Sequence, residues 1–209
     1  MSDPLRELLE GVASGRWPQW GAAVQVLSPS PPDLVGVLAF SGCSIVAADV
    51  DPAWVARLCS ADDLSAPLCP PFLMALSARV QRAVNNIDII CVAEPASVPT
   101  GAPELTEREP SEHPRVLRSL GYRSDVHMWT TPGAILVLGR GVARRWEVAV
   151  EVAESARGRG LGRLLAAAAR GLVPPGEPLW AQIAPGNAAS VRAFLAAGFR
   201  PVGAEALLH

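Results

Sequence analysis

The sequence contains no lysine: all 18 of its basic side chains are arginines, and 20 carboxylates bring the net charge to -2. The absence of lysine excludes a Schiff-base lysine and the lysine of a phosphate-binding P-loop. A nearly balanced charge gives no broad electrostatic attraction to nucleic acid or to an anionic membrane surface. We therefore expect neither nucleic acid nor a membrane as a partner.

Cysteine and histidine are also scarce. The four cysteines form no C-x-x-C pair, and only three histidines accompany them. This spacing does not predict a zinc site, so we expect no metal and interpret the cysteines as buried free thiols. The chain shows no basic n-region followed by an apolar h-region, and no apolar run long enough for a membrane span. The expected location is the cytoplasm.

Apolar residues are abundant enough for a substantial core, since half of the 209 residues are hydrophobic and 18% are charged. A chain of this length forms one domain or two lobes of about 100 residues each. Asp-Pro or Pro-Pro pairs precede amphipathic stretches and predict helices that begin near Asp3, Asp51 and Pro70. Apolar runs bounded by glycine and proline predict strands at 22–27, 34–40, 44–48 and 87–93. The first part of the chain is thus predicted to be α/β.

Composition divides the chain near its middle. The segment from Glu94 to Pro114 holds five prolines, five glutamates and few large apolar side chains. Such a segment cannot pack a core, so we predict a linker over 95–114 between an N-terminal lobe, 1–94, and a second lobe, 115–209. In the second lobe the patterns predict strands at 122–130, 134–138, 146–152, 179–184 and 200–208, with helices beginning near Leu161 and Asn187.

The strand predicted at 146–152 leads into Arg157-Gly158-Arg159-Gly160-Leu161-Gly162 and then into a helix. The free N–H groups at a helix start and the positive end of its dipole form an anion site. The three glycines permit close backbone approach, and Arg157, Arg159 and Arg163 supply bidentate phosphate contacts. A dinucleotide fingerprint fits poorly, because Arg163 stands where its last glycine belongs. Nucleotide binding without coenzyme A stays open as a further alternative.

The pattern that remains is Arg-x-x-Gly-x-Gly, and it resembles the GNAT superfamily of acyl-CoA-dependent N-acyltransferases. A second part of the resemblance runs from Asn187-Ala188-Ala189-Ser190 through Phe194 to Gly198-Phe199. Together the two parts cover about Tyr122 to Leu208. The resemblance implies an α/β (α+β) fold in which a GNAT-like mixed sheet with helices on both faces is preceded by a smaller α/β lobe. That first lobe is expected to be a diverged companion that shapes the acceptor site.

The resemblance also implies a function, namely transfer of an acetyl group from acetyl-CoA to an amine on a small molecule or a peptide. A non-catalytic acyl-CoA-binding sensor or interaction module is the alternative. The residues that would bind the cofactor belong to the strand end, the glycine segment and the following helix: Val150, Val152, Ala153, Arg157, Gly158, Arg159, Gly160, Leu161, Gly162, Arg163, Asn187 and Ser190.

Catalysis requires a proton acceptor, because an alkylammonium of pKa about 10.4 must lose its proton before it attacks a thioester. In the family a glutamate on the strand before the phosphate loop often takes this proton. Glu147 and Glu151 are the candidates here, and their spacing puts them on one face of the strand. The sequence departs from the family at Phe194, where many members have a tyrosine that protonates the departing thiolate.

Overall fold

The computed structural model describes residues 3–17, 24–60 and 63–209, and the chain divides into two compact units. The first unit comprises residues 1–90 and 202–209, and the second comprises residues 91–201. The predicted boundaries differ from this division in two respects. The last strand returns to the first unit, and the segment predicted as a linker lies within the second. Whether 1–94 and 115–209 form separate domains stays a prediction.

The first unit is built on the strands β1 (Gln25–Leu27), β2 (Val35–Phe40), β3 (Cys43–Ala47) and β10 (Arg200–Leu208). Their order is β1-β3-β2-β10, with β1 parallel to β3 and the other two pairs antiparallel. Of the strand predicted at 22–27, residues 22 and 23 lie outside the described residues. A further strand, β4 (Val84–Ala93), carries the chain across residue 90 into the second unit.

Four helical segments complete this unit: α1 (Pro4–Ala13), α2 (Pro52–Leu58), the 3-10 turn η1 (Ala66–Leu68) and α3 (Pro70–Val80). The predicted caps are confirmed, because Asp3 accepts a hydrogen bond from the Arg6 N–H and Asp51 accepts one from the Ala53 N–H. A buried cluster joins Val55 of α2 and Leu76 of α3 to Val37 and Val46 of the strands. The apolar faces of α2 and α3 are therefore buried against the strands of this unit.

In the second unit the strand order is β9-β8-β7-β6-β5, and the sheet is mixed. Its strands are β5 (Thr106–Arg108), β6 (Ser124–Thr131), β7 (Ala134–Arg140), β8 (Trp146–Val152) and β9 (Leu179–Ile183). Only β8 and β9 are parallel among these pairs. A parallel connection needs a crossover, and α5 (Leu161–Ala169) supplies it between β8 and β9.

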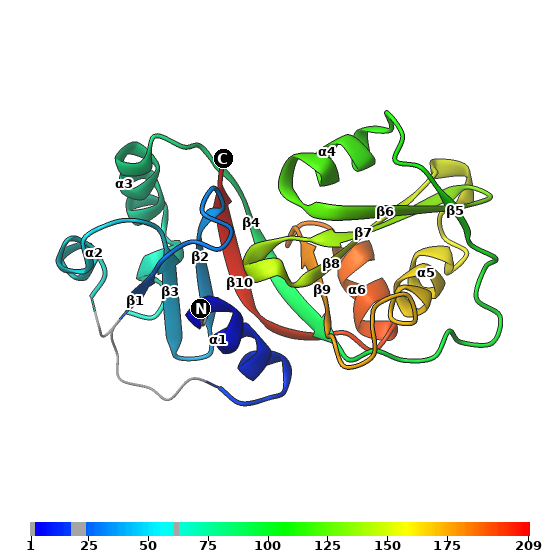
Figure 1. Ribbon diagram of the computed structural model, residues 1–209, viewed down its shortest axis with the longest axis horizontal. Helices are drawn as coiled ribbons and strands as arrows, with labels where there is room; N and C mark the ends of the chain where they lie inside the picture. Colours follow the sequence, from blue (N-terminus) through cyan, green and yellow to red (C-terminus); the bar gives the residue numbers. More distant parts are fainter. Residues whose placement is uncertain (1–2, 18–23, 61–62) are drawn as a thin grey trace. The chain divides into compact units, whose positions relative to one another are not determined.

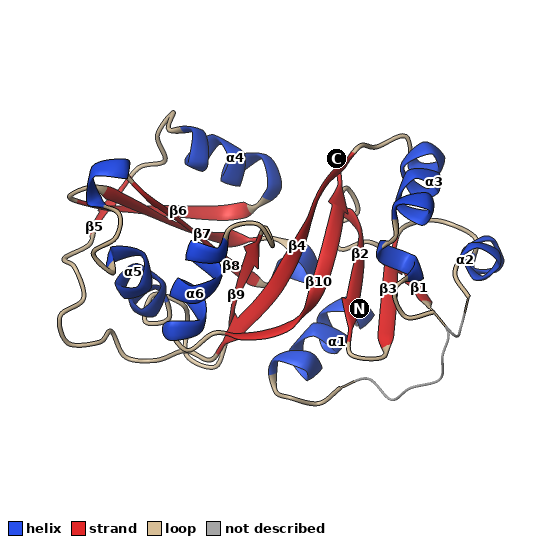
Figure 2. Ribbon diagram, turned by 180° about the vertical axis from the view of Figure 1, so that it is seen from behind, coloured by secondary structure: helices blue, strands red, loops and turns tan. Residues whose placement is uncertain are grey.

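Helices cover both faces of this sheet (Figure 1). On one face α4 (Pro114–Tyr122) buries Val116 against Met128 and Val137. On the other, α5 packs against β8, β7 and α6 (Ala188–Ala196), as seen from behind in Figure 2. Short 3-10 turns, η2 (Val142–Arg144) and η3 (Glu154–Ala156), flank β8. The predicted mixed α/β fold with helices on both faces is confirmed.

The segment predicted as a linker contains structure that composition does not reveal. It holds the edge strand β5, and His113 in it caps α4 by accepting a hydrogen bond from the Arg115 N–H. The strand predicted to start at Tyr122 instead begins at Ser124, because Tyr122 ends α4. No helix was predicted here because His113 is not one of the usual N-cap residues, although Pro114 at the first helical position is a helix-start signal.

Candidate functional site

The strand β8 is paired along its whole length on one side only. Its pairing with β7 runs from Trp146 to Val152, but its pairing with β9 stops at Val148 opposite Ala181. The two strands diverge beyond that point. Residues 149–152 are half-buried and have no partner in β9. A strand edge with unpaired N–H and C=O groups is a place where an extended ligand can bind.

The direction of these backbone groups follows from one hydrogen bond. The Ala153 N–H donates to the Gly133 carbonyl at 2.8 Å, so Ala153 faces β7. Backbone groups alternate sides along an antiparallel strand, and Val150 and Val152 therefore face the unpaired side. The Val152 carbonyl accepts a hydrogen bond from Arg157 Nε at 3.1 Å. Of the predicted strand residues, Val150 and Val152 lie on the unpaired edge, whereas the Ala153 N–H is already bonded.

The glycine segment forms an exposed loop between η3 and α5. Gly158 and Gly160 have φ of +77° and +78°, a left-handed conformation that side chains disfavour. No atom lies within 4 Å of a Cβ built on either residue, so these glycines are required for backbone conformation and not for space. Gly160 is the N-cap of α5 and provides no side-chain cap. The first N–H groups of α5 are thus left for a ligand or water.

Arginines surround this helix start. Arg157 is tied to the end of β8, as described above. Arg159 and Arg163 are exposed, and neither side chain forms a hydrogen bond or an ion pair with any residue that the structure describes. The open N–H groups, the helix dipole and two uncommitted guanidinium groups meet at one place. This combination suits a diphosphate.

Asn187 and Ser190 lie at the start of α6, the helix after β9. The Asn187 side-chain oxygen caps α6 by accepting a hydrogen bond from the Ser190 N–H at 3.1 Å. Asn187 is exposed and Ser190 is half-buried. Both residues therefore have a local structural role, which leaves the Asn187 amide nitrogen and the Ser190 hydroxyl for a ligand.

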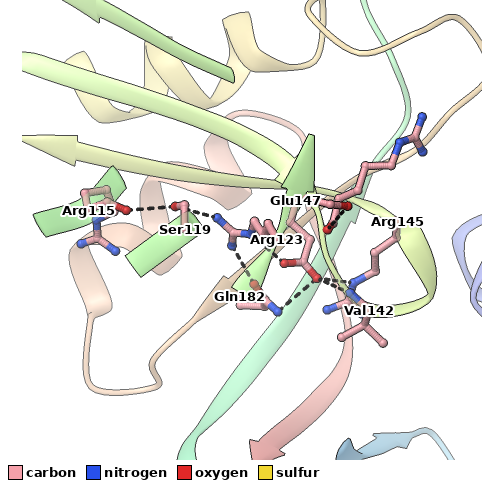
Figure 3. Close-up of polar contacts among 9 residues, drawn as sticks. Arg115, Ser119, Arg123, Val142, Arg145, Glu147 and Gln182 are labelled. Atoms are coloured by element: carbon pink, nitrogen blue, oxygen red, sulfur yellow. Dashed lines mark hydrogen bonds and ion pairs between the residues drawn. The ribbon is translucent and has the colours of Figure 1, made fainter. Parts of the chain in front are cut away.

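Glu147 occupies the paired half of β8 and is 2% exposed. Its carboxylate accepts hydrogen bonds from Arg123 Nε and Arg145 Nε, each at 2.9 Å, and from the Gln182 amide at 3.2 Å (Figure 3). Burial favours the neutral acid, but Arg145 and Arg123 together hold the pKa of Glu147 below its usual range. A buried carboxylate whose oxygens are held by two guanidinium groups is a poor proton acceptor. This environment argues against the base role predicted for Glu147.

Glu151 lies on the same face four residues later, and its surroundings differ. Its side chain is 39% exposed, and it accepts a hydrogen bond from Arg115 Nε of α4 at 3.1 Å. His113 Nε2 lies 3.9 Å from the other carboxylate oxygen. Because the His113 Nδ1 accepts the Arg115 N–H, the neutral ring carries its proton on Nε2. His113 is therefore not poised as a base, and Glu151 is the accessible carboxylate of β8.

Phe194, at the position of the family tyrosine, is buried and packs edge-on against Phe199 with ring centroids 4.9 Å apart. Its ring belongs to the apolar packing of α6. Two of the cysteines are also poorly suited to nucleophilic chemistry: burial raises the pKa of Cys59 and of Cys91 to about 11, which disfavours the reactive thiolate.

Three residues near Glu147 carry no motif and were not predicted: Ser119, Arg123 and Gln182. Arg123 donates to the Ser119 hydroxyl and to Gln182 as well as to Glu147. The available sequence signal was a single polar residue in the buried strand Leu179–Ile183. Arg123 and Gln182 reach the Glu147 carboxylate from distant parts of the chain, so their contact leaves no local sequence signal.

Neither a metal centre nor a transmembrane helix is apparent in the described residues. Among them, no group of three or more His, Cys, Asp or Glu side chains is placed to hold a metal ion. None of the helices formed by residues 3–17, 24–60 and 63–209 has both the length and the apolar composition of a membrane span.

The Glu147 cluster predicts an acid-sensitive contribution to stability. Replacement Glu147→Gln removes the carboxylate charge that Arg123 and Arg145 share and should lower the free energy of unfolding by about 3 kcal/mol at pH 7. Because the folded-state pKa is lowered, the contribution is present above the unfolded pKa of about 4.3 and is lost as the pH falls through the folded value. Denaturant unfolding measured from pH 7 to pH 3 should show the gap between the two proteins shrinking with acid.

The exposed Glu104 provides the control, since Glu104→Gln should change stability little at any pH. A gap between wild type and Glu147→Gln that stays constant with pH would contradict the assignment of this titration to Glu147.

Comparisons with known proteins give a family match that includes the glycine segment. Residues 148–207, less than a third of the chain, match the family described as FR47-like protein. No curated protein matches the sequence. Among solved structures, a GCN5-related N-acetyltransferase from Kribbella flavida is 18% identical, with a TM-score of 0.41 over 66% of this chain and 63% of that one. A GCN5-related N-acetyltransferase from Sphaerobacter thermophilus is 12% identical, with a TM-score of 0.42 over 93% of this chain and 62% of that one.

This chain thus spans less than two thirds of the length of each of those two structures. The family match begins in β8, continues through the glycine loop, α5, β9 and α6, and ends in β10. It therefore includes the unpaired strand edge and the uncapped helix described above. It also falls within the part of the chain whose sequence resembles the GNAT superfamily.

Proposed function

We propose that the second unit binds an acyl-coenzyme A, acetyl-CoA in particular, and transfers its acyl group to an amine of a small molecule or a peptide. The observation that carries the proposal is the continuous path from the unpaired edge of β8 to the uncapped start of α5. An extended, amide-containing arm that ends in a diphosphate matches both parts of this path. Dinucleotides and simple nucleotides lack such an arm, which is why coenzyme A is favoured over them.

In this proposal the loop and helix start hold the diphosphate. The N–H groups of Leu161, Gly162 and Arg163 face it, while the positive φ values of Gly158 and Gly160 shape the turn. The guanidinium groups of Arg159 and Arg163, with Arg157 bracing the turn against Val152, add charge. The pantetheine arm lies along Val150 and Val152 and ends toward the point where β9 joins β8. Ala153, Asn187 and Ser190 border the cofactor.

The acceptor amine must lose a proton before it attacks, at a cost of roughly 4 to 5 kcal/mol at neutral pH for an amine of pKa about 10.4. We assign the proton-accepting role to Glu151, directly or through water, because it is the accessible carboxylate on β8. A backbone N–H of the unpaired edge near Val152 stabilises the oxyanion of the tetrahedral intermediate. Phe194 cannot donate a proton, so coenzyme A leaves as a thiolate, which its thiol pKa of about 8.5 permits.

The function is tested by incubating the protein with acetyl-CoA and a panel of amines while free thiol is measured. Thiol release that depends on an amine, with formation of the acetylated amine, is the expected result. Tight acetyl-CoA binding without thiol release would favour the alternative, a non-catalytic acyl-CoA sensor. The chain has no lysine, so acetylation of its own lysines cannot contribute to the signal.

The loop conformation predicts the effect of a β-branched side chain at Gly160. Replacement Gly160→Val puts such a residue at φ of +78° and should weaken coenzyme A binding at least tenfold by calorimetry, because the loop must change conformation. Folding should persist, since no atom is within 4 Å of the new Cβ.

Gly176 supplies a matched control for that substitution. It lies between α5 and β9, has φ of +83° and also has open space around its Cβ position. Gly176→Val introduces the same strain away from the proposed site and should leave coenzyme A affinity unchanged. Equal coenzyme A affinities in the wild type and both variants would show that the loop is not part of the binding site.

The base assignment predicts a pH-dependent defect. Replacement Glu151→Gln should lower kcat about a hundredfold at pH 7. The defect should diminish as the pH approaches the pKa of the acceptor amine, because the amine then deprotonates without help. Steady-state kinetics from pH 6.5 to 9.5 measure this, with Glu109→Gln, a substitution at an exposed carboxylate, as the control. A kcat of Glu151→Gln equal to that of the wild type would exclude Glu151 as the base.

A further inference from the structure

The end of the β8–β9 pairing coincides with an unusual polar side chain. The last paired residues are Val148 and Ala181, and the next residue of β9 is Gln182. The rest of β9 is apolar and buried, whereas Gln182 is half-buried. Its side chain projects to the face that carries Glu147 and Arg123, as Figure 3 shows.

Both ends of the Gln182 amide are engaged. Its oxygen accepts a hydrogen bond from Arg123 Nη2 at 2.9 Å, and its nitrogen donates to Glu147 Oε1 at 3.2 Å. Glu147 lies on the paired half of β8, and Arg123 follows α4. Gln182 therefore links β9 to β8 and to the end of α4 at the first position where the backbone ladder no longer does so.

We infer that Gln182 is a positioning residue that fixes where β8 and β9 separate, and thereby sets the length and place of the strand edge that receives the pantetheine arm. This inference rests on the function proposed above. The carboxylate and guanidinium that hold Gln182 are themselves buried and bonded to further groups, so the amide has a fixed anchor. Without the amide, the three-residue ladder ends without this side-chain link, and its end can fray or extend.

The two parts of coenzyme A would contact different elements of the second unit. The pantetheine arm would lie along the edge that Gln182 positions, whereas the nucleotide and diphosphate would contact the glycine loop and the start of α5. Loss of the amide should therefore affect ligands that contain pantetheine and spare those that lack it. General destabilisation of the second unit would weaken both kinds of ligand.

The test is the variant Gln182→Leu, which removes both hydrogen bonds and leaves Arg123 paired with Glu147. Calorimetry on the full chain should show coenzyme A bound about tenfold more weakly than by the wild type, roughly the effect of one lost ligand hydrogen bond. Affinity for 3′-phospho-ADP, which has the diphosphate but no pantetheine, should change less than twofold. The KM for acetyl-CoA should rise by a factor similar to that for coenzyme A.

The exposed Gln25 of β1 gives a matched control, since Gln25→Leu makes the same chemical change in the first unit and should alter neither affinity. If Gln182→Leu does not fold, Gln182→Met, with an unbranched side chain, allows the same comparison. Unchanged coenzyme A affinity in a folded Gln182 variant, or equal weakening of both ligands, would overturn the inference while leaving the proposed function intact. If the wild type binds no coenzyme A, the proposed function fails, and the inference fails with it.

Discussion

The buried carboxylate of Glu147 is the interaction on which the arrangement of the second unit depends. A charge inside a protein is tolerated only when partners compensate it, and here Arg123, at the end of α4, and Arg145, directly before β8, do so. The turn before β8 adds the Val142 N–H, and a side chain on Gly141 would overlap the carboxylate. The end of α4, the β7–β8 turn and β9 are thereby all held against one residue.

The two halves of β8 differ in their strand pairing and in the surroundings of their glutamates. The first half, up to Val148, is paired on both sides and carries the buried Glu147. The second half is open toward β9, carries the accessible Glu151 and continues into the glycine loop. Glu147 and Glu151 are the same residue type on the same face, and pattern alone assigns them equal roles. Burial and arginine contacts separate a carboxylate that organises the fold from one that is available to a substrate.

Local signals in the sequence were sufficient for much of this structure. The Asp-Pro caps at Asp3 and Asp51 and the glycine loop before α5 are read from adjacent residues, and the structure confirms these caps and this loop. The helix α4 was not predicted because a histidine caps it in place of the usual Ser, Thr, Asp or Asn. The partners of Glu147 escaped because Arg123 and Gln182 lie 24 and 35 residues away in the chain. Pairings of that kind are set by tertiary structure and leave no periodic signal.

The assignment of the last strand, β10, to a unit is likewise set by tertiary structure. The family match runs from residue 148 to residue 207, yet residues 202–209 cluster with the first unit. There β10 pairs with β2 from Gly203 opposite Phe40 to Leu208 opposite Val35, and Ala206 and Leu208 are fully buried. A fragment that lacked residues 1–94 would expose this strand edge and its apolar side chains to water. The first unit therefore completes the fold of the segment that matches the FR47-like family, because the chain returns to this unit for the final strand.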